Sequence, residues 1–310
     1  MSPSRFEAGI LAQPALLRAA LSAPAPAWLA PPKGRRIFLV GVGSNRHAAE
    51  LAAWLWSREG FDVRAVHAHD FVSRPYRLKR GDLGVFLSHR GGRSYTVEAE
   101  RLARRAGART VLVTAAGSAW KGARRLQTGP LEDAAAFTQS FTTTMAWLLR
   151  WAGAPALLRP FARVDESLEW GPAFPAVRHD DDVVFVGDGP REWVAREAAL
   201  KLQETAYLRA RAFGLEEFLH GPHISTGVGS LVVGFSAPEE KRWAAARAYL
   251  RAIRVPFVEA AGGDWLAQTL WGQRFALASC RRLGIDPDLI RADDPRYRRA
   301  RALLSLGLPD

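Results

Sequence analysis

The sequence predicts an α/β protein with two doubly wound parallel sheets, each covered by helices on both faces. Residues 37–40, which follow Arg36, and residues 183–186 are apolar without polar alternation, which is typical of strands buried on both faces of a parallel sheet. Helical patterns alternate with such segments, and this alternation favours the same architecture. The order of strand, turn and helix restarts at Asp182, so we expect one plan to occur twice.

The elements of the first half follow from this alternation. A helix over 6–21 is expected to be interrupted near Pro14, and a Pro/Ala-rich connector follows over 23–33. Strands are predicted over 36–40, 61–68, 82–87 and 110–114, and helices over 46–59, 95–106 and 137–151. We place the first domain, with its leading helix, at residues 1–155.

The second half begins after a predicted linker at residues 156–180, which is rich in Pro and Gly and lacks sustained periodicity. The second domain is placed at residues 181–310. Its predicted strands lie over 183–186, near Ala210, over 231–235 and over 256–259, and its predicted helices lie over 191–205 and 239–253.

Composition narrows the class of protein. The chain has 310 residues, which is enough for two domains, and 48% of them are apolar. The single cysteine, Cys280, excludes an internal disulfide and a Cys-based zinc site, and it suits a reducing cytoplasm. No signal peptide opens the chain and no apolar run approaches the roughly 20 residues of a membrane span. A cytoplasmic location is therefore expected.

The net charge of +12 raises the question of nucleic-acid binding. The arginines are scattered over many predicted helices, and no nucleic-acid motif accompanies them. The charge is better explained by a basic surface that attracts anionic metabolites such as phosphosugars.

Two turns rich in Gly and Ser follow predicted strands. Residues 41–45 read Gly-Val-Gly-Ser-Asn, and residues 88–94 read Ser-His-Arg-Gly-Gly-Arg-Ser. A strand, a glycine-rich turn and a helix together direct backbone N–H groups and a helix dipole at an anion. In parallel sheets, ligands bind beyond the carboxyl ends of the strands, where both turns are expected.

A row of charges marks the helix predicted over 191–205. Glu197, Lys201 and Glu204 are spaced at i, i+4 and i+7, so they project from one face. On spacing alone, such a row is typical of a solvated stripe of salt bridges. Sixteen residues after Glu204 stands the turn at His220, and a carboxylate with an imidazole is what proton transfer beside a carbonyl needs.

These stretches resemble the sugar isomerase (SIS) family, in particular the isomerase half of glutamine–fructose-6-phosphate aminotransferase. Residues 197–204, EAALKLQE, match the pattern E-x-A-L-K-L-x-E, and residues 217–222, EFLHGP, match E-x-x-H-G-P. The resemblance implies two SIS domains, each a flavodoxin-like three-layer sandwich. It implies that Glu204 moves the proton between C1 and C2 of a sugar. His220 would serve ring opening from the partner subunit, while Lys201 is either an ion-pair partner or a substrate ligand.

The resemblance extends to the loops. Residues 43–48 are similar to G-T-S-x-H-A, and residues 88–96 are similar to the phosphate loop S-x-S-G-x-T. The substrate and phosphate ligands implied in this way are Ser44, Asn45, Ser88, His89, Arg90, Gly91, Arg93 and Ser94. Departures are also present. Arg90 and Arg93 either bind phosphate or fill the pocket, and Phe137 replaces a sugar-binding serine. Residues 295–300, PRYRRA, lack the family's Schiff-base lysine.

The sequence therefore predicts a phosphosugar-binding enzyme of the isomerase type. It would be an aldose–ketose isomerase or an amino-sugar phosphate deaminase or deglycase, working by proton transfer at C1/C2. No cofactor or metal is expected, and no glutaminase activity, because no glutaminase domain is recognised. The expected partners are a sugar phosphate and a second copy of the chain in a homodimer, with neither nucleic acid nor membrane. The alternative is a non-catalytic protein that binds sugar phosphates for regulation.

Overall fold

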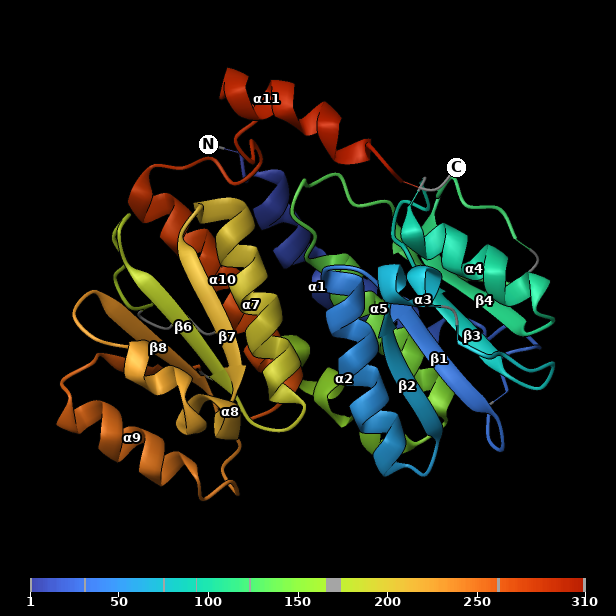
Figure 1. The fold of residues 1–310 in the computed structure, drawn as a ribbon, viewed down its shortest axis with the longest axis horizontal. Helices are drawn as coiled ribbons and strands as arrows, with labels where there is room; N and C mark the ends of the chain where they lie inside the picture. Colours follow the sequence, from blue (N-terminus) through green and yellow to red (C-terminus); the bar gives the residue numbers. More distant parts are fainter. Residues whose placement is uncertain are drawn as a thin grey trace. The chain divides into compact units, whose positions relative to one another are not determined.

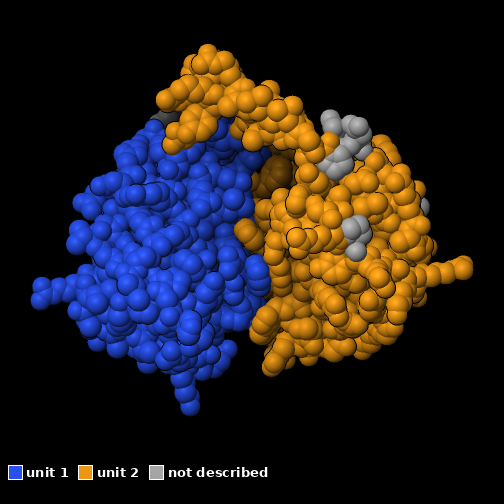
Figure 2. Space-filling model, viewed as in Figure 1, with its two compact units in different colours: residues 1–11, 134–136, 160–290 blue, residues 12–133, 137–159, 291–310 orange. Residues whose placement is uncertain are grey.

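The computed structural model describes residues 2–30, 32–74, 76–92, 94–122, 124–165, 174–260 and 263–308. The chain divides into two compact units, which Figure 2 distinguishes by colour. Unit 1 comprises residues 1–11, 134–136 and 160–290, and unit 2 comprises residues 12–133, 137–159 and 291–310. Within the predicted linker, residues 166–173 lie outside the described ranges.

Unit 2 is built on a parallel sheet with the strand order β2-β1-β3-β4-β5. Its strands are β1 (Arg36–Gly41), β2 (Asp62–His67), β3 (Leu83–Leu87), β4 (Arg109–Ala116) and β5 (Arg125–Pro130). The prediction of a parallel sheet is confirmed, although β5 was not foreseen. Its sequence, RLQTGP, has too few apolar residues to indicate a buried strand.

Helices cover both faces of this sheet (Figure 1). On one face lie α2 (Ser44–Arg58) and α5 (Gln139–Ala152), which meet through Trp56 and Trp151 with ring centres 5.8 Å apart. On the other face lie α3 (Ala68–Ser73) and α4 (Tyr95–Arg105), which pack over Phe38 and Phe86. Burying such a ring stabilises the fold by about 1.5–3 kcal/mol.

Unit 1 repeats the plan with the strand order β7-β6-β8-β9, again parallel. The strands are β6 (Asp182–Gly187), β7 (Arg209–Gly214), β8 (Ser230–Phe235) and β9 (Phe257–Glu259). On one face lie α7 (Arg191–Ala206) and α10 (Trp265–Leu283), and on the other lie α8 (Leu215–His220) and α9 (Trp243–Ala252) (Figure 1).

The side chains of β6 show why the two faces of unit 1 are distinct. Val184 and Val186 pack with Phe218 of α8 and Trp243 of α9. Phe185 points the other way, and its ring centre lies 6.2 Å from that of Phe275 in α10. Successive side chains alternate between the faces of a strand, so an apolar β6 supplies both cores.

The remaining described elements are α1 (Arg5–Ser22), α11 (Pro295–Arg301) and three short 3₁₀ segments, Pro155–Arg163, Pro222–Ser225 and Ala302–Ser305. The expected interruption near Pro14 is wrong, because α1 continues through this proline, which removes only one helical N–H donor. Within the described ranges, every helix is too short or too polar to cross a bilayer.

Candidate functional site

The first group of predicted ligands follows β1 and β3, which are neighbours in the sheet of unit 2. Val40 lies opposite Phe86 in parallel register, so the turns after both strands start at the same edge. The sheet continues to β2 on one side of β1 and to β3 on the other, which makes this edge a switch point in strand order. Open α/β sheets bind ligands at such a point. Ser44 and Asn45, both half-buried, begin α2 there.

Hydrogen bonds from the end of β4 and from the residues after it hold the backbone of the turn at 88–94. The carbonyl of His89 accepts from the N–H of Ala115 at 3.1 Å, and the carbonyl of Arg90 accepts from the N–H of Ala119 at 3.2 Å. The loop therefore has a fixed path before any ligand arrives. Such preorganisation lowers the entropic cost of binding.

Gly91 is required at the centre of this loop. Its φ of +62° lies in the left-handed region, and a Cβ there would lie 2.4 Å from both Ser118 Oγ and Trp120 Cβ. The hydroxyl of Ser88 accepts from the N–H of Gly91 at 3.3 Å, which ties the first loop residue to the fourth. Within the described residues, the hydroxyl proton of Ser88 has no acceptor.

Ser94 ends the loop and is the N-cap residue of α4. Its Oγ is buried and has no hydrogen-bond partner among the residues that the structure describes. A buried hydroxyl in this state costs about 1–3 kcal/mol. A phosphate oxygen beside it would remove that cost and would also be attracted by the positive end of α4. Arg93, the neighbouring predicted ligand, lies outside the described residues.

The ring of His89 is buried and holds the next segment of chain. Its Nε2 accepts from the N–H of Glu132 at 2.7 Å, and its ring centre lies 4.8 Å from that of Phe137. Burial, together with the nearby positive charge of Arg90, lowers the pKa of His89 to about 4. The ring is therefore neutral near pH 7, with its proton on Nδ1. A role for His89 as phosphate ligand stays a prediction, beside this structural role.

Arg90 has an exposed side chain whose guanidinium lies 5.2 Å from the ring centre of Phe137. The ring face attracts the cation and restricts its position. Among the described residues, no carboxylate forms an ion pair with Arg90. Phe137 contacts both Arg90 and His89, and it holds the guanidinium of Arg90 beside the glycine loop. Within the described residues, this positive charge has no carboxylate partner.

The second group of predicted residues lies on α7 of unit 1, where the expected ion pairs are present. Lys201 Nζ is 3.4 Å from Glu197 Oε1 and 2.6 Å from Glu204 Oε2. The side chains of Lys201 and Glu197 are each only 1% exposed, whereas that of Glu204 is 37% exposed. The row is therefore buried at one end and open at the other, unlike a solvated stripe.

Glu204 differs from Glu197 and Lys201 because its side chain is partly exposed. Lys201 occupies Oε2, and no described residue donates to Oε1. A carboxylate held in place at one oxygen and open at the other can accept a proton and return it. The arrangement therefore suits a proton shuttle.

His220 lies away from Glu204 within unit 1. It is the exposed last residue of α8, directly before Gly221 and Pro222. Because α8 covers the face of the sheet opposite α7, the sheet separates His220 from Glu204 in one chain (Figure 1). The structure thus brings Lys201 to Glu204 but leaves His220 on the other face.

Sequence reasoning missed the contacts of Glu132. This buried carboxylate accepts from the N–H of Thr138 at 2.6 Å and from the N–H of Ser140 at 3.1 Å, so it caps the start of α5. No spacing rule identifies a carboxylate cap that stands six to eight residues ahead of its donors in the sequence. Among the described residues, no group of three or more His, Cys, Asp or Glu side chains could hold a metal ion.

Sequence comparison identifies relatives of this chain. Residues 32–150 match the family model of the SIS domain. The chain is 28% identical over 224 residues to glutamine–fructose-6-phosphate aminotransferase [isomerizing] of Methanothermobacter thermautotrophicus, a match that covers 66% of this chain and 37% of that protein. The chain thus spans about a third of the length of the curated relatives that it matches.

Two solved structures share the fold over nearly the whole chain. Glucosamine-6-phosphate deaminase from Thermotoga maritima superposes with a TM-score of 0.76 at 20% identity, covering 92% of this chain and 97% of that one. Tagatose-6-phosphate ketose/aldose isomerase from Escherichia coli superposes with a TM-score of 0.73 at 22% identity, covering 92% and 95%. At these identities the likeness concerns the fold.

Proposed function

Residues 32–150 of this chain are a SIS domain, and from this we propose that the chain is a phosphosugar enzyme of the isomerase type. The reaction would be aldose–ketose isomerisation, or deamination or deglycation of an amino-sugar phosphate, through proton transfer between C1 and C2. We extend the proposal to residues 181–310 as a second SIS domain, because unit 1 repeats the sheet plan of unit 2.

The observation that carries the proposal is the state of Glu204. Its carboxylate is ion-paired at Oε2 with the buried Lys201 and open at Oε1. In the proposed step, Oε1 takes the proton from one carbon of the open-chain sugar and delivers it to the neighbouring carbon. Lys201 keeps the carboxylate oriented and offsets the charge of the buried Glu197. No lysine of residues 295–300 takes part, because that segment contains none.

The loop at 88–94 of unit 2 would hold the phosphate group of a sugar phosphate. The uncompensated guanidinium of Arg90, the unpartnered hydroxyl of Ser94 and the start of α4 all favour a dianion there.

A homodimer is part of this proposal. If His220 opens the sugar ring that Glu204 then isomerises, both groups must reach one substrate, yet the sheet of unit 1 separates them within a chain. A second copy of the chain would supply His220 from outside, which agrees with its exposed position before a turn.

The decisive experiment is turnover by the purified chain. Fructose 6-phosphate, glucosamine 6-phosphate and a fructosamine phosphate would be tested for isomerisation or release of the amine. On the active substrate, Glu204→Gln should retain binding and lower kcat by roughly 10²–10⁴, the usual scale for loss of a general base. Glu239→Gln, an exposed carboxylate on the surface of unit 1, is the matched control. Full activity of Glu204→Gln would remove the base assignment.

Subunit mixing tests the origin of His220. His220→Asn and Glu204→Gln should each be inactive alone, whereas mixed dimers should recover part of the activity, since one complete site is rebuilt. If the mixture stays as inactive as its components, or if the active protein is a monomer, His220 does not act across subunits.

The alternative of a non-catalytic sugar-phosphate binding protein is favoured by Phe137, whose ring stands where the resemblance implies a sugar-binding hydroxyl. In both functions, the double variant Ser88→Ala with Arg90→Ala should weaken binding of the sugar phosphate by about tenfold or more. Unchanged affinity in a folded double variant would contradict the phosphate assignment. Binding without turnover across the panel would select the alternative.

A further inference from the structure

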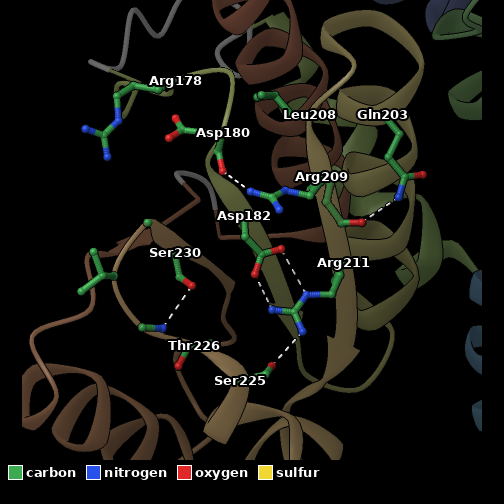
Figure 3. Close-up of a pocket in the computed structure, with 14 residues that line it drawn as sticks. Arg178, Asp180, Asp182, Gln203, Leu208, Arg209, Arg211, Ser225, Thr226 and Ser230 are labelled. Carbon is green, nitrogen blue, oxygen red and sulfur yellow. Dashed lines mark hydrogen bonds and ion pairs between the residues drawn. The ribbon is translucent and has the colours of Figure 1, made fainter.

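A separate hollow lies in unit 1, at the edge of the sheet where β6, β7 and β8 begin (Figure 3). Its volume is about 960 Å³, within the range of small-molecule sites. Its walls include the first residues of the three strands, Asp182, Arg209 and Ser230, and the glycine-rich loop that precedes β8. None of the residues assigned above to the reaction lines it.

One wall of the hollow is rigid and electrically neutral. Arg211 contacts both carboxylate oxygens of Asp182, through Nε at 3.2 Å and through Nη2, and its Nη1 donates to Ser225 Oγ at 2.7 Å. This two-point pairing fixes the guanidinium and offsets both charges (Figure 3). Arg211 and Asp182 therefore shape the hollow without adding net charge to it.

The remaining guanidinium groups are less satisfied. Arg209 donates through Nη2 to the backbone carbonyl of Asp180, and no carboxylate of the described chain forms an ion pair with it. Arg178 pairs with Asp181 through Nε at 3.4 Å, and its side chain is 74% exposed. Once these pairs are taken into account, Arg209 carries the positive charge that lacks an offset.

Asp180 and Ser230 complete the set of available groups. No hydrogen bond or ion pair engages the carboxylate of Asp180 within the described residues, and this side chain lines the hollow. Ser230 is only 8% exposed, and its Oγ accepts from the N–H of Gly227 at 3.1 Å. Its hydroxyl proton finds no acceptor in the part of the chain that the structure describes. The hollow thus offers one cation, one anion and one buried donor.

We propose that this hollow binds a small phosphorylated amine, of the size of an amino-sugar phosphate. The phosphate would accept from Arg209 and Ser230, since a phosphate has enough oxygens for a guanidinium and a hydroxyl together. The ammonium group would pair with Asp180. A simple anion is disfavoured, because the unengaged carboxylate of Asp180 would repel it. The proposal uses no residue of the proposed isomerase site and stands independently of it.

Calorimetry with two matched ligands tests this site. The protein would carry Ser88→Ala and Arg90→Ala, so that the loop of unit 2 does not contribute, and the ligands would be glucosamine 6-phosphate and glucose 6-phosphate. We expect glucosamine 6-phosphate to bind roughly tenfold or more tightly than glucose 6-phosphate, the scale of a charged hydrogen bond. Adding Asp180→Asn should remove this preference.

The role of Arg209 is tested in the same background. Arg209→Gln should weaken binding of glucosamine 6-phosphate by roughly tenfold or more, and Arg209→Lys, which keeps the charge but loses the fork, should weaken it less. Arg247→Gln, at an exposed arginine of α9 paired with Glu259, is the control of equal charge change. Equal affinity for the two sugars, unchanged binding by folded Arg209→Gln, or no binding at all would overturn the proposal. None of these results bears on turnover, so the proposed function is judged separately.

Discussion

The turns after β1 and β6 occupy the same place in two sheets of one plan, yet their side chains differ in kind. After β1 come glycines, Ser44 and Asn45, and the adjacent turn after β3 exposes Arg90 and buries the unpartnered hydroxyl of Ser94. After β6 the corresponding position is filled by a charged network. Asp188 accepts from Trp243 Nε1 at 2.7 Å and lies 3.7 Å from Arg191.

This difference bears on the proposal that the edge of unit 2 binds an anion. In unit 1, Arg191 also donates to Gln268 at 3.1 Å, and the side chains of Asp188 and Arg191 are only 11% and 12% exposed. A buried carboxylate repels phosphate, and the arginine that could attract it is already engaged. The two edges are alike in fold and differ in their residues, because Asp188 and Arg191 of unit 1 pair with each other, whereas Arg90 of unit 2 has no ion pair among the described residues. In unit 1, the predicted site residues Lys201 and Glu204 instead form an ion pair on helix α7.

The comparison of the two units can be tested by measuring the free energy of unfolding of variants. The largest change is expected at the buried ion pair of Lys201 and Glu197 in unit 1. Lys201→Met should lower the free energy of unfolding by about 3–5 kcal/mol, because it removes the cation beside the buried carboxylate of Glu197. Lys241→Met, at an exposed lysine, should change it by less than about 0.5 kcal/mol. Urea unfolding of both variants measures the difference. Equal stabilities would show that the row on α7 is not an interior ion pair.

The next effect tests the backbone of the receptive loop in unit 2. Gly91→Ala should cost about 2–4 kcal/mol, since left-handed strain of about 1–2 kcal/mol adds to overlap with Ser118 and Trp120. Gly92→Ala is the matched control, because a Cβ at Gly92 meets no atom within 4 Å. Thermal or urea unfolding reports both. A tolerated Gly91→Ala would mean that the loop is not held as tightly as its contacts indicate.

The smallest expected effect is a change of the free energy of unfolding with pH, caused by the buried His89 of unit 2. Above pH 6.5, His89 is neutral in the folded and the unfolded chain, so its contribution is constant. Between pH 6.5 and about 4 the unfolded chain binds a proton that the folded chain does not, so stability falls as the pH falls. The complete loss corresponds to about 3 kcal/mol, and only part of it is reached at pH 5.

His89→Gln tests this dependence, because an amide oxygen can still accept from the N–H of Glu132. The variant should lose less stability than the unmodified chain between pH 6.5 and pH 4.5, measured by urea unfolding at each pH. His179→Gln, at an exposed histidine of unit 1, should follow the unmodified chain. Parallel curves for His89→Gln and the unmodified chain would contradict the burial of a neutral His89.

Much of the fold was predictable from local patterns. The strands at 36–40 and 183–186 were found because parallel strands buried on both faces consist of apolar residues. In contrast, β5 and α10 were not predicted, since the first is polar and the second lacks a marked apolar stripe. For the site, periodicity placed Glu197, Lys201 and Glu204 on one face of a helix, but it could not say that two of them are buried.

By itself, the sequence determined the α/β class with parallel sheets, the two glycine-rich turns, and the ion-paired row on α7. These features depend on residues close together in the chain, where helical and strand periodicity bring side chains into contact. Only the tertiary structure decided that His220 and Glu204 lie on opposite faces of one sheet, that the ring of His89 is buried against Glu132, and that Arg209, Asp180 and Ser230 line a common hollow. Such relations depend on how distant segments pack, and packing is set by the whole core rather than by any single stretch.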